Sequence, residues 1–273
     1  MQNSMQNSTQ NSYTVLMLGD LVGEPGRRLF EKHLPILKDK YKPSLVIANG
    51  ENSANGKGIT TKIMSWFKEL GVDVVTSGNH IFDKNDIYGY LDSNKDLLRP
   101  ANFPSQAPGT GMTIVKKGAT NFGIINLQGR VFMRQQLSCP FKEIDSLLTY
   151  LKHHANIILV DFHAETTSEK LAMAYYLDGR VSAVCGTHTH VQTADERILP
   201  AGTAYITDLG MAGSLNSMIG MQKEPLIKAM ISQMPVKFEV QDEPPFVMSG
   251  VAITIGSNGK ASKIERIYIV DTN

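Results

Sequence analysis

Short apolar segments recur along this chain, and each one ends in glycine and polar residues before a helical pattern begins. The first three such segments are residues 13–18, 44–48 and 72–76. Amphipathic patterns typical of helices lie between them, over 23–40 and 60–70. Strands that alternate with helices in this way predict βαβ units and a mostly parallel central sheet.

The second half of the chain is richer in strands. Residues 99–111 hold three prolines and predict a long loop. After it we expect paired strands at 112–115 and 122–126, a helix at 141–152, a strand at 157–161, a helix at 168–177 and a strand at 181–185. Further short strands are expected at 204–207, 236–240, 251–255 and 264–270, with a helix at 225–234. A second sheet packed on the first explains this strand-rich end.

The length of 273 residues fits one large α/β domain, which we place at 13–273. Residues 1–12 read as an imperfect polar repeat, and we expect them to be disordered. The 27 basic and 26 acidic side chains give a net charge of +1. This balance excludes a global basic field of the kind that binds nucleic acid in bulk.

Cysteine usage and hydropathy predict a cytoplasmic protein. The two cysteines are Cys139, before a proline, and Cys185, in an apolar strand pattern, so no disulfide framework is implied. No apolar run approaches the roughly 18 to 20 residues of a membrane span. The N-terminus lacks the charged and then apolar pattern of a signal peptide. We therefore expect no association with a membrane.

Side chains of metal-ligand type follow five of the predicted strands. They are Asp20, Glu51, Asn52, Asn79, His80, His163, His188 and His190. Any one of them alone is more often a turn or helix-capping residue. In an open α/β sheet, however, ligands bind outside the carboxyl ends of the strands. The repeated placement predicts that these side chains meet at one edge.

The ligand types indicate the chemistry of such a site. Imidazole, carboxylate and amide oxygen together suit Mn, Fe or Zn rather than Ca, and the absence of a cysteine set argues against structural zinc. His188 and His190 alternate on an extended segment, so each could serve a different metal. Glu51 has two oxygens and is the natural bridge. Two such metals would clamp a phosphoryl group and generate a hydroxide near neutral pH.

Five motifs resemble those of the calcineurin-like metallophosphoesterases. They are GDLVG (19–23), GEN (50–52), GNH (78–80), DFHAE (161–165) and GTHTH (186–190). The first motif lacks the histidine that the general family has two residues after its aspartate. The second carries Glu51 where the family has aspartate. Both departures match a narrower bacterial group, the YmdB-like phosphodiesterases, and the resemblance runs from about Tyr13 to the C-terminus.

This resemblance implies a four-layer α/β/β/α sandwich of two mixed sheets flanked by helices. It also implies a di-iron or di-manganese centre, hydrolysis of 2′,3′-cyclic nucleotides and a homo-oligomer. One metal would be held by Asp20, Glu51, Asn52 and His190, and the other by Glu51, Asn79, His163 and His188. His80 matches the proton donor of the family. The missing histidine leaves one metal with fewer strong ligands, so this metal would either bind more weakly or use Asn52 and water instead.

The expected reaction is attack by a metal-bound hydroxide that breaks the 2′ ester and leaves a 3′-nucleotide. Either Fe or Mn is expected, with Zn also compatible. Arg27, near a helix N-terminus beside Asp20, could hold a substrate phosphate, although a solvated arginine in a tight turn is the plainer interpretation. Asn55 lies in the loop 52–58, which we expect to shape the pocket. RNA ends are expected as a further class of substrate.

Two other functions remain open at this point. A phosphomonoesterase or nucleotidase could use the same metals, since the ligands contact only the phosphate. Alternatively, the chain could be an RNA-linked regulatory binding protein in which catalysis is secondary. The near-neutral charge and the lack of an RNA-binding motif argue against strong RNA binding.

Overall fold

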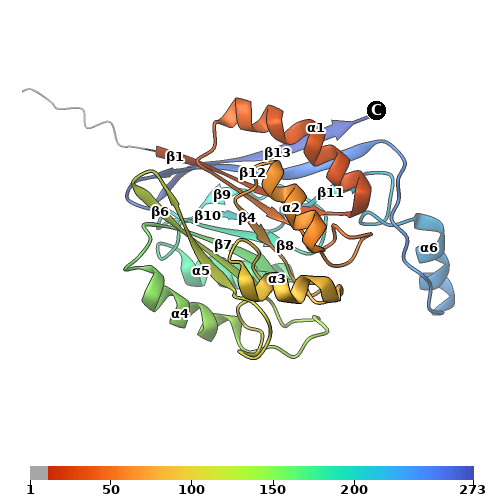
Figure 1. Cartoon of the computed structure of the whole chain (residues 1–273), viewed down its shortest axis with the longest axis horizontal. Coiled ribbons are helices and arrows are strands. Elements are labelled where there is room, and N and C mark those ends of the chain that lie inside the picture. The colour runs from red at the N-terminus through yellow and green to blue at the C-terminus, as the bar shows by residue number, and fades with distance from the viewer. Residues whose placement is uncertain (1–11) are drawn as a thin grey trace, which may run out of the picture.

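Two mixed β-sheets lie face to face, and helices cover the outer face of each (Figure 1). The computed structural model describes residues 12–273. Three apolar clusters separate the layers, one between the two sheets and one under the helices on either side. The chain is therefore a four-layer α/β/β/α sandwich, which confirms the fold expected from the sequence.

The first sheet has seven strands in the order β2-β11-β12-β1-β3-β4, with β13 paired to β12. Its strands are β1 (Ser12–Leu18), β2 (Asp20–Leu21), β3 (Leu45–Asn49), β4 (Val74–Thr76), β11 (Met211–Ser214), β12 (Phe246–Gly256) and β13 (Ala261–Asp271). β1, β3 and β4 run parallel, whereas β12 is antiparallel to β1. The βαβ part of the chain thus forms the parallel half of this sheet.

The second sheet has six strands in the order β5-β6-β7-β8-β10-β9. They are β5 (Met112–Lys117), β6 (Thr120–Gln128), β7 (Ile157–His163), β8 (Ala183–Thr187), β9 (Arg197–Ile198) and β10 (Ala204–Ile206). The four central strands β6, β7, β8 and β10 are parallel, and the outer strands β5 and β9 are antiparallel to their neighbours. Parallel strands bring their carboxyl ends to one edge.

Helices α1 (Gly23–Tyr41) and α2 (Thr61–Glu69) cover the first sheet, and α4 (Pro140–Leu151) and α5 (Thr167–Leu177) cover the second. A short 3₁₀ turn, η1 (Asn85–Ile87), and α3 (Tyr88–Ser93) follow β4. Helix α6 (Lys223–Ser232) projects from the side of the sandwich (Figure 1). None of the helices within 12–273 has the length and apolar character needed to cross a bilayer.

The side chains of β1 show why the strands are buried on both faces. Leu16 and Leu18 pack under the helices, whereas Val15 and Met17 lie between the two sheets. Successive side chains of a strand point to opposite faces, so only a continuous apolar run can fill both layers. This is the pattern by which the sequence predicts the parallel strands.

Two sequence-based expectations differ from the structure. Residues 236–240 form no strand and make only one bridge, between Val240 and Met221. Their alternating pattern faces the surface beside α6, where no strand of the described chain pairs with them. Ser12, expected to be disordered, is the first residue of β1 and pairs with Gly256. The rest of that expectation falls on 1–11, outside the described residues.

Candidate metal centre

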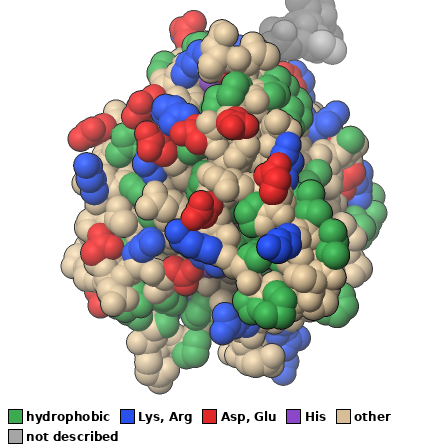
Figure 2. All heavy atoms as spheres, turned by 90° about the vertical axis from the view of Figure 1, so that its right-hand side faces the viewer, with side chains coloured by type: hydrophobic (Ala, Val, Ile, Leu, Met, Phe, Trp, Pro, Cys, Tyr) green, Lys and Arg blue, Asp and Glu red, His purple; other side chains and the backbone are tan. Residues whose placement is uncertain are grey.

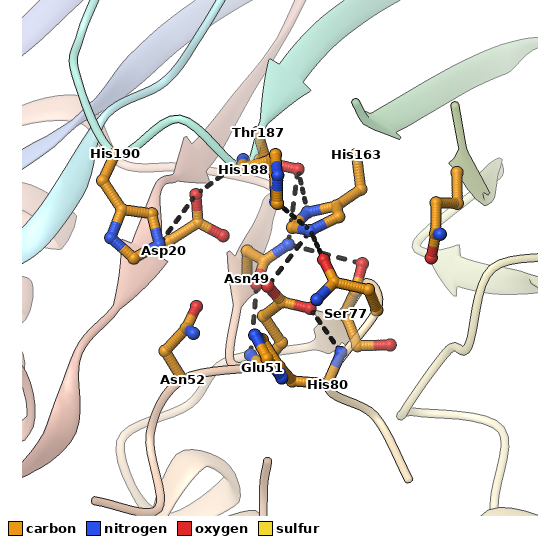
Figure 3. A network of polar contacts seen from close by, with 12 residues as sticks. Asp20, Asn49, Glu51, Asn52, Ser77, His80, His163, Thr187, His188 and His190 are labelled. Carbon is orange, nitrogen blue, oxygen red and sulfur yellow. Dashed lines mark hydrogen bonds and ion pairs between the residues drawn. The ribbon is translucent and has the colours of Figure 1, made fainter. Parts of the chain in front are cut away.

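The carboxyl ends of strands from both sheets meet at one place (Figure 3). Asp20 starts β2, separated from the end of β1 by one residue, and Glu51 and Asn79 follow β3 and β4. His163 ends β7 of the second sheet, and His188 follows β8. The structure therefore brings together side chains that lie up to 168 residues apart, such as Asp20 and His188.

A first group of ligand atoms converges on the ring of His163. Its Nε2 lies 3.0 Å from Glu51 Oε1, 3.0 Å from Asn79 Oδ1 and 3.0 Å from His188 Nδ1. A ring nitrogen carries at most one hydrogen, so these contacts cannot all be hydrogen bonds. Four atoms with lone pairs that surround one small space are an arrangement that fits a divalent cation.

Hydrogen bonds behind this group set the direction of both rings. His163 Nδ1 lies 2.9 Å from Thr187 Oγ1, which donates to Asp161 Oδ1 at 2.7 Å. The threonine oxygen therefore accepts from Nδ1–H and leaves the Nε2 lone pair facing the group. His188 Nε2 lies 3.0 Å from Glu165 Oε2, which fixes its hydrogen there and leaves Nδ1 free.

The pKa shifts in the first group show that a positive charge at this place is favourable. Burial lowers the pKa of His163, but the Glu51 carboxylate beside it outweighs burial and raises that pKa. Burial opposes ionisation of Glu51, yet the same His163 lowers the Glu51 pKa. Burial and His163 together lower the pKa of His188 to about 3, so this ring is neutral and able to act as a ligand.

A second group consists of Asp20, Asn52 and His190. Asp20 Oδ2 accepts the backbone N–H of His188 at 2.9 Å, while its Oδ1 is buried without a partner among the described residues. Asn52 Nδ2 donates to Gly56 O at 3.0 Å, and Asn52 Oδ1 also lacks a partner in this part of the chain. His190 Nδ1 donates to Ile219 O at 2.8 Å, which leaves Nε2 4.0 Å from Asp20 Oδ2.

These orphaned oxygens fit a cation. A buried acceptor without a partner costs about 1–3 kcal/mol, so two in one group indicate a place for positive charge. Burial is the main reason that the pKa of Asp20 lies well above its usual value, and Glu51 and Asp208 add to it against the opposing effect of His163. A divalent cation would reverse this effect and keep the carboxylate ionised.

The loop that carries His188 and His190 is held in an unusual backbone conformation. The φ angles are 101° at His188 and 64° at His190, in the left-handed region that side chains other than glycine rarely adopt. Such strain occurs where the surrounding structure enforces it, often at functional sites. Here it turns His188 toward the first group and His190 toward the second (Figure 3).

The side chain of His80 lies beside both groups and makes no hydrogen bond to either. Its backbone N–H donates to Glu51 Oε2 at 3.2 Å, and its Nδ1 lies 2.8 Å from Asp83 Oδ2. The side chain is 25% exposed. It lines a cavity of about 200 Å³ together with Glu51, Asn52, Gly56, Lys57, His188, His190, Ile219, Met221 and Phe238. This cavity opens the ligand atoms to solvent.

The two candidate substrate residues lie elsewhere. Arg27 Nη1 donates to the backbone oxygen of Ser53, so its guanidinium ties α1 to the loop after Glu51. Asn55 is exposed at the tip of that loop, with φ 56°, and lines a separate cavity beside Glu24 and Pro25. Neither side chain belongs to the lining of the cavity over the ligand groups.

Sequence reasoning missed several residues that support the site. Glu165 and Asp83 orient His188 and His80. Lys170 Nζ lies 2.6 Å from Asp208 Oδ2 in a fully buried ion pair, and the same oxygen accepts Thr189 N–H at 3.1 Å. Glu165 lies within the DFHAE motif, so the sequence could have indicated that it supports the site. No sequence pattern indicates the Lys170–Asp208 pair, because its partners are 38 residues apart.

Comparisons with known proteins show the family to which the chain belongs. A family model described as YmdB-like protein matches residues 16–267. The 2′,3′-cyclic-nucleotide 2′-phosphodiesterase of Bacillus subtilis (strain 168) is 50% identical over 258 residues, which are 94% of this chain and 97% of that protein. A similarity of this extent covers every strand end that contributes to the site.

Solved structures share the architecture. The crystal structure of a novel phosphatase from Mycoplasma pneumoniae has a TM-score of 0.91 at 38% identity, and the match covers 97% of this chain and 95% of that one. A 5′-nucleotidase precursor from Thermus thermophilus has a TM-score of 0.58 at 14% identity, and the match covers 96% of this chain and 55% of that one. The second likeness is one of fold alone.

Proposed function

Because the chain belongs to the YmdB-like protein family, we propose that it is a metal-dependent phosphoric diester hydrolase that acts on 2′,3′-cyclic nucleotides. The observation that carries the proposal is the pair of ligand groups on either side of Glu51, which share one cavity (Figure 3). The Bacillus subtilis relative is named for cleavage of the 2′ ester of such nucleotides. We assign the same reaction to this chain.

Each group would hold one divalent cation. Glu51, Asn79, His163 and His188 form one set, and Asp20, Asn52 and His190 form the other, with Glu51 between them. Bound cations would neutralise phosphoryl charge and lower the pKa of a water, so that a nucleophile forms near neutral pH. Imidazole, carboxylate and amide oxygens favour Fe or Mn and also accept Zn.

His80 is the proposed proton donor to the leaving oxygen. Its Nδ1 is engaged by Asp83 at 2.8 Å, which leaves Nε2 available to the cavity. In the reaction, a water oxygen bonds to phosphorus and gives up one proton to solvent, while the bond from phosphorus to O2′ breaks. Nε2–H transfers its proton to O2′, the product is a 3′-nucleotide with a free 2′ hydroxyl, and His80 regains its proton from solvent.

Three finer assignments accompany this function as proposals. RNA ends that carry a 2′,3′-cyclic phosphate present the same chemical group and are proposed as further substrates. A homo-oligomer is proposed from the resemblance to the family. A reducing compartment, the cytoplasm, is proposed because both cysteines are free and Cys185 is buried in β8.

The test is turnover of 2′,3′-cyclic AMP by protein loaded with Mn²⁺, with chromatography to separate 3′-AMP from 2′-AMP. We expect 3′-AMP. His80→Asn should lower kcat roughly 100- to 10,000-fold while the protein keeps its metal. The matched control is His153→Asn, an exposed histidine just after α4, which should retain full activity. Full activity in His80→Asn would remove the role given to this residue.

Parallel assays with p-nitrophenyl phosphate and its bis-ester separate the other functions. Brisk hydrolysis of the monoester without turnover of the cyclic nucleotide would replace the proposal with a phosphatase or nucleotidase. Inactivity on all three substrates with full metal content, together with binding of single-stranded RNA by metal-free protein, would identify a regulatory binding protein instead.

A further inference from the structure

An apolar groove adjoins the metal cavity. It is formed around α6, which lies on the side of the molecule that Figure 2 turns toward the viewer. Its volume is about 830 Å³, and α6 with the segments on either side of it forms its walls. The residues that matter here are Met218, Ile219, Leu226, Met230, Val236 and Phe238. Ile219 and Phe238 also line the metal cavity, so the two spaces share a wall.

The size of the metal cavity sets a limit on what it can hold. At about 200 Å³ it is smaller than the roughly 300 Å³ at the lower end of pockets that enclose a whole small molecule. A phosphoryl group and part of a ribose fit this space, but a complete nucleotide does not. Ile219 and Phe238 line both spaces, so the groove is an apolar surface next to the cavity that can take the rest of the substrate.

The chemistry of the groove selects a neutral, flat group. Among the described residues that line it none is charged, and its two polar side chains, Ser217 and Gln233, already make hydrogen bonds within the chain. A second phosphate would find no counter-charge on these walls. An aromatic ring would find methionine, aliphatic and phenyl surfaces, which is the environment in which a nucleobase stacks without readout of its edges.

Phe238 stands at the junction of the two spaces. Its side chain is half exposed, and Lys57 Nζ lies 5.1 Å from the centre of its ring. Lys57 also lines the metal cavity. The cation–π contact with Lys57 therefore holds the ring of Phe238 in place. The ring is still partly exposed, so a base can stack on it.

We propose that this groove is the nucleoside subsite of the enzyme and that Phe238 stacks on the base. The inference rests on the proposed function and adds the part of the site that binds the base. Because the groove is lined almost wholly by apolar side chains, the subsite accepts all four bases. The specificity constants, kcat/KM, of the four cyclic nucleotides should lie within about tenfold of one another, with purines favoured by their larger stacking surface.

The experiment compares a substrate that has a base with one that lacks it. The specificity constant for cyclic AMP (the 2′,3′ isomer) is divided by that for glycerol 1,2-cyclic phosphate, in wild type and in Phe238→Ala. We expect the ratio to fall roughly 5- to 150-fold in Phe238→Ala, mainly because cyclic AMP acquires a higher KM. Phe238→Tyr should restore most of the ratio, because it keeps a ring at this position.

The controls keep the result interpretable. Tyr150→Ala removes an exposed ring from α4, in the helical layer over the second sheet, and should leave the ratio as in wild type. Thermal unfolding of each variant shows whether it is folded. If wild type hydrolyses neither cyclic substrate, the proposed function fails. If wild type hydrolyses both and Phe238→Ala keeps the wild-type ratio, the subsite is wrong while the function stands.

The same proteins also test the rival occupant of the groove, a second copy of this chain. Light scattering gives the mass of wild type and of Phe238→Ala in solution. A change in mass together with an unchanged ratio would assign the groove to a subunit interface and overturn the nucleoside subsite. Equal masses with a lowered ratio are the expected result.

Discussion

At the scale of single residues, the ring of His188 is held from both of its nitrogens. Nδ1 faces His163, while Nε2–H donates to the half-exposed Glu165 at 3.0 Å. A carboxylate behind a ligating imidazole fixes its tautomer and raises its basicity. Glu165 therefore has a role in metal affinity without contact to the metal itself.

Glu165→Ala should weaken Mn²⁺ binding about 10- to 100-fold, because the ring of His188 loses its orientation. Equilibrium dialysis of metal-free protein measures the dissociation constant. Glu69→Ala, at the end of α2 on the surface, is the matched control. Unchanged affinity in Glu165→Ala would show that the ion pair with His188 is incidental.

Gly78 makes room for the ring of His163. A Cβ atom at this position would lie 2.1 Å from His163 Cδ2, far inside van der Waals contact. Gly78→Ala should displace the ring, lower metal affinity at least tenfold and cost about 1–3 kcal/mol of folding stability. Gly89→Ala in α3 is the control, since no atom of the described chain lies within 4 Å of its added methyl group. Metal titration and urea unfolding check both variants.

The sequence predicts well which residues lie at the site. It predicts less well which way each side chain points and which groups it contacts there. Asp20, Glu51 and His163 follow apolar strands, so their position at the sheet edge follows from the parallel topology. Glu165 and Asp83 lie in loops, where the local pattern does not say which way a side chain turns. The direction of the Arg27 side chain on α1 was also not predictable. Its guanidinium donates to the backbone oxygen of Ser53 and does not line the cavity.

At the scale of elements, a buried ion pair anchors the loop between β8 and the second ligand group. Lys170 of α5 and Asp208 after β10 are both fully buried, and Asp208 also accepts the backbone N–H of Thr189. The pair thus links a helix of the outer layer to the residue between His188 and His190. Removal of one partner would leave a buried charge without compensation.

Lys170→Met should lower the free energy of unfolding by about 3–5 kcal/mol, since the buried Asp208 loses the partner of its ion pair. Lys152→Met, exposed after α4, should change it by less than about 0.5 kcal/mol. Urea denaturation at pH 7 measures both. A loss as small as that of the control would mean that Asp208 is neutral or reaches solvent.

Elements were predictable where burial dictates a pattern. The apolar runs of β1, β3, β7 and β8 are filled on both faces, so they stand out in the sequence. Residues 236–240 alternate as a strand does, yet they lie at the surface next to α6, where the described chain offers no strand to pair with. The short helix α3 was missed because its six residues are too few for a clear period.

At the scale of the whole molecule, the last strand is tied to the first helix through one carboxylate. Asp271 of β13 accepts Lys32 Nζ at 2.9 Å and lies 2.6 Å from His33 Nε2, both on α1. These hydrogen bonds, that of Lys32 first, hold the pKa of Asp271 well below its usual value. The final strand is thereby fixed to a helix that lies 238 residues earlier in the chain.

The pKa of Asp271 is lower in the folded protein than in the unfolded chain, where it is near 4. Its hydrogen bonds therefore contribute fully to stability above about pH 4, and this contribution is lost as the pH falls toward the folded-state pKa. Asp271→Asn should cost about 1 kcal/mol at pH 7, a modest figure because Lys32 is half exposed. The gap between wild type and variant should narrow below about pH 4. Urea unfolding at neutral and at acidic pH measures it, and a gap that stays constant would contradict the linkage.

The four layers follow from the resemblance to the metallophosphoesterases, whereas composition and periodicity alone supply only a parallel core with a strand-rich end. Pairings between distant segments were beyond the sequence. Strand β2 pairs with β11, which places Asp20 opposite Met211, far along the chain. Such contacts join segments of the first sheet that lie far apart in the sequence, and no local pattern encodes them.

The most direct test of the account is the number of Mn²⁺ ions bound per chain at saturation, measured by equilibrium dialysis and elemental analysis. The two ligand groups predict two ions in wild type and one ion in each of His163→Ala and His190→Ala, because each substitution disables a different group. A single ion in wild type, or the same loss of both ions in each variant, would contradict the two-metal centre.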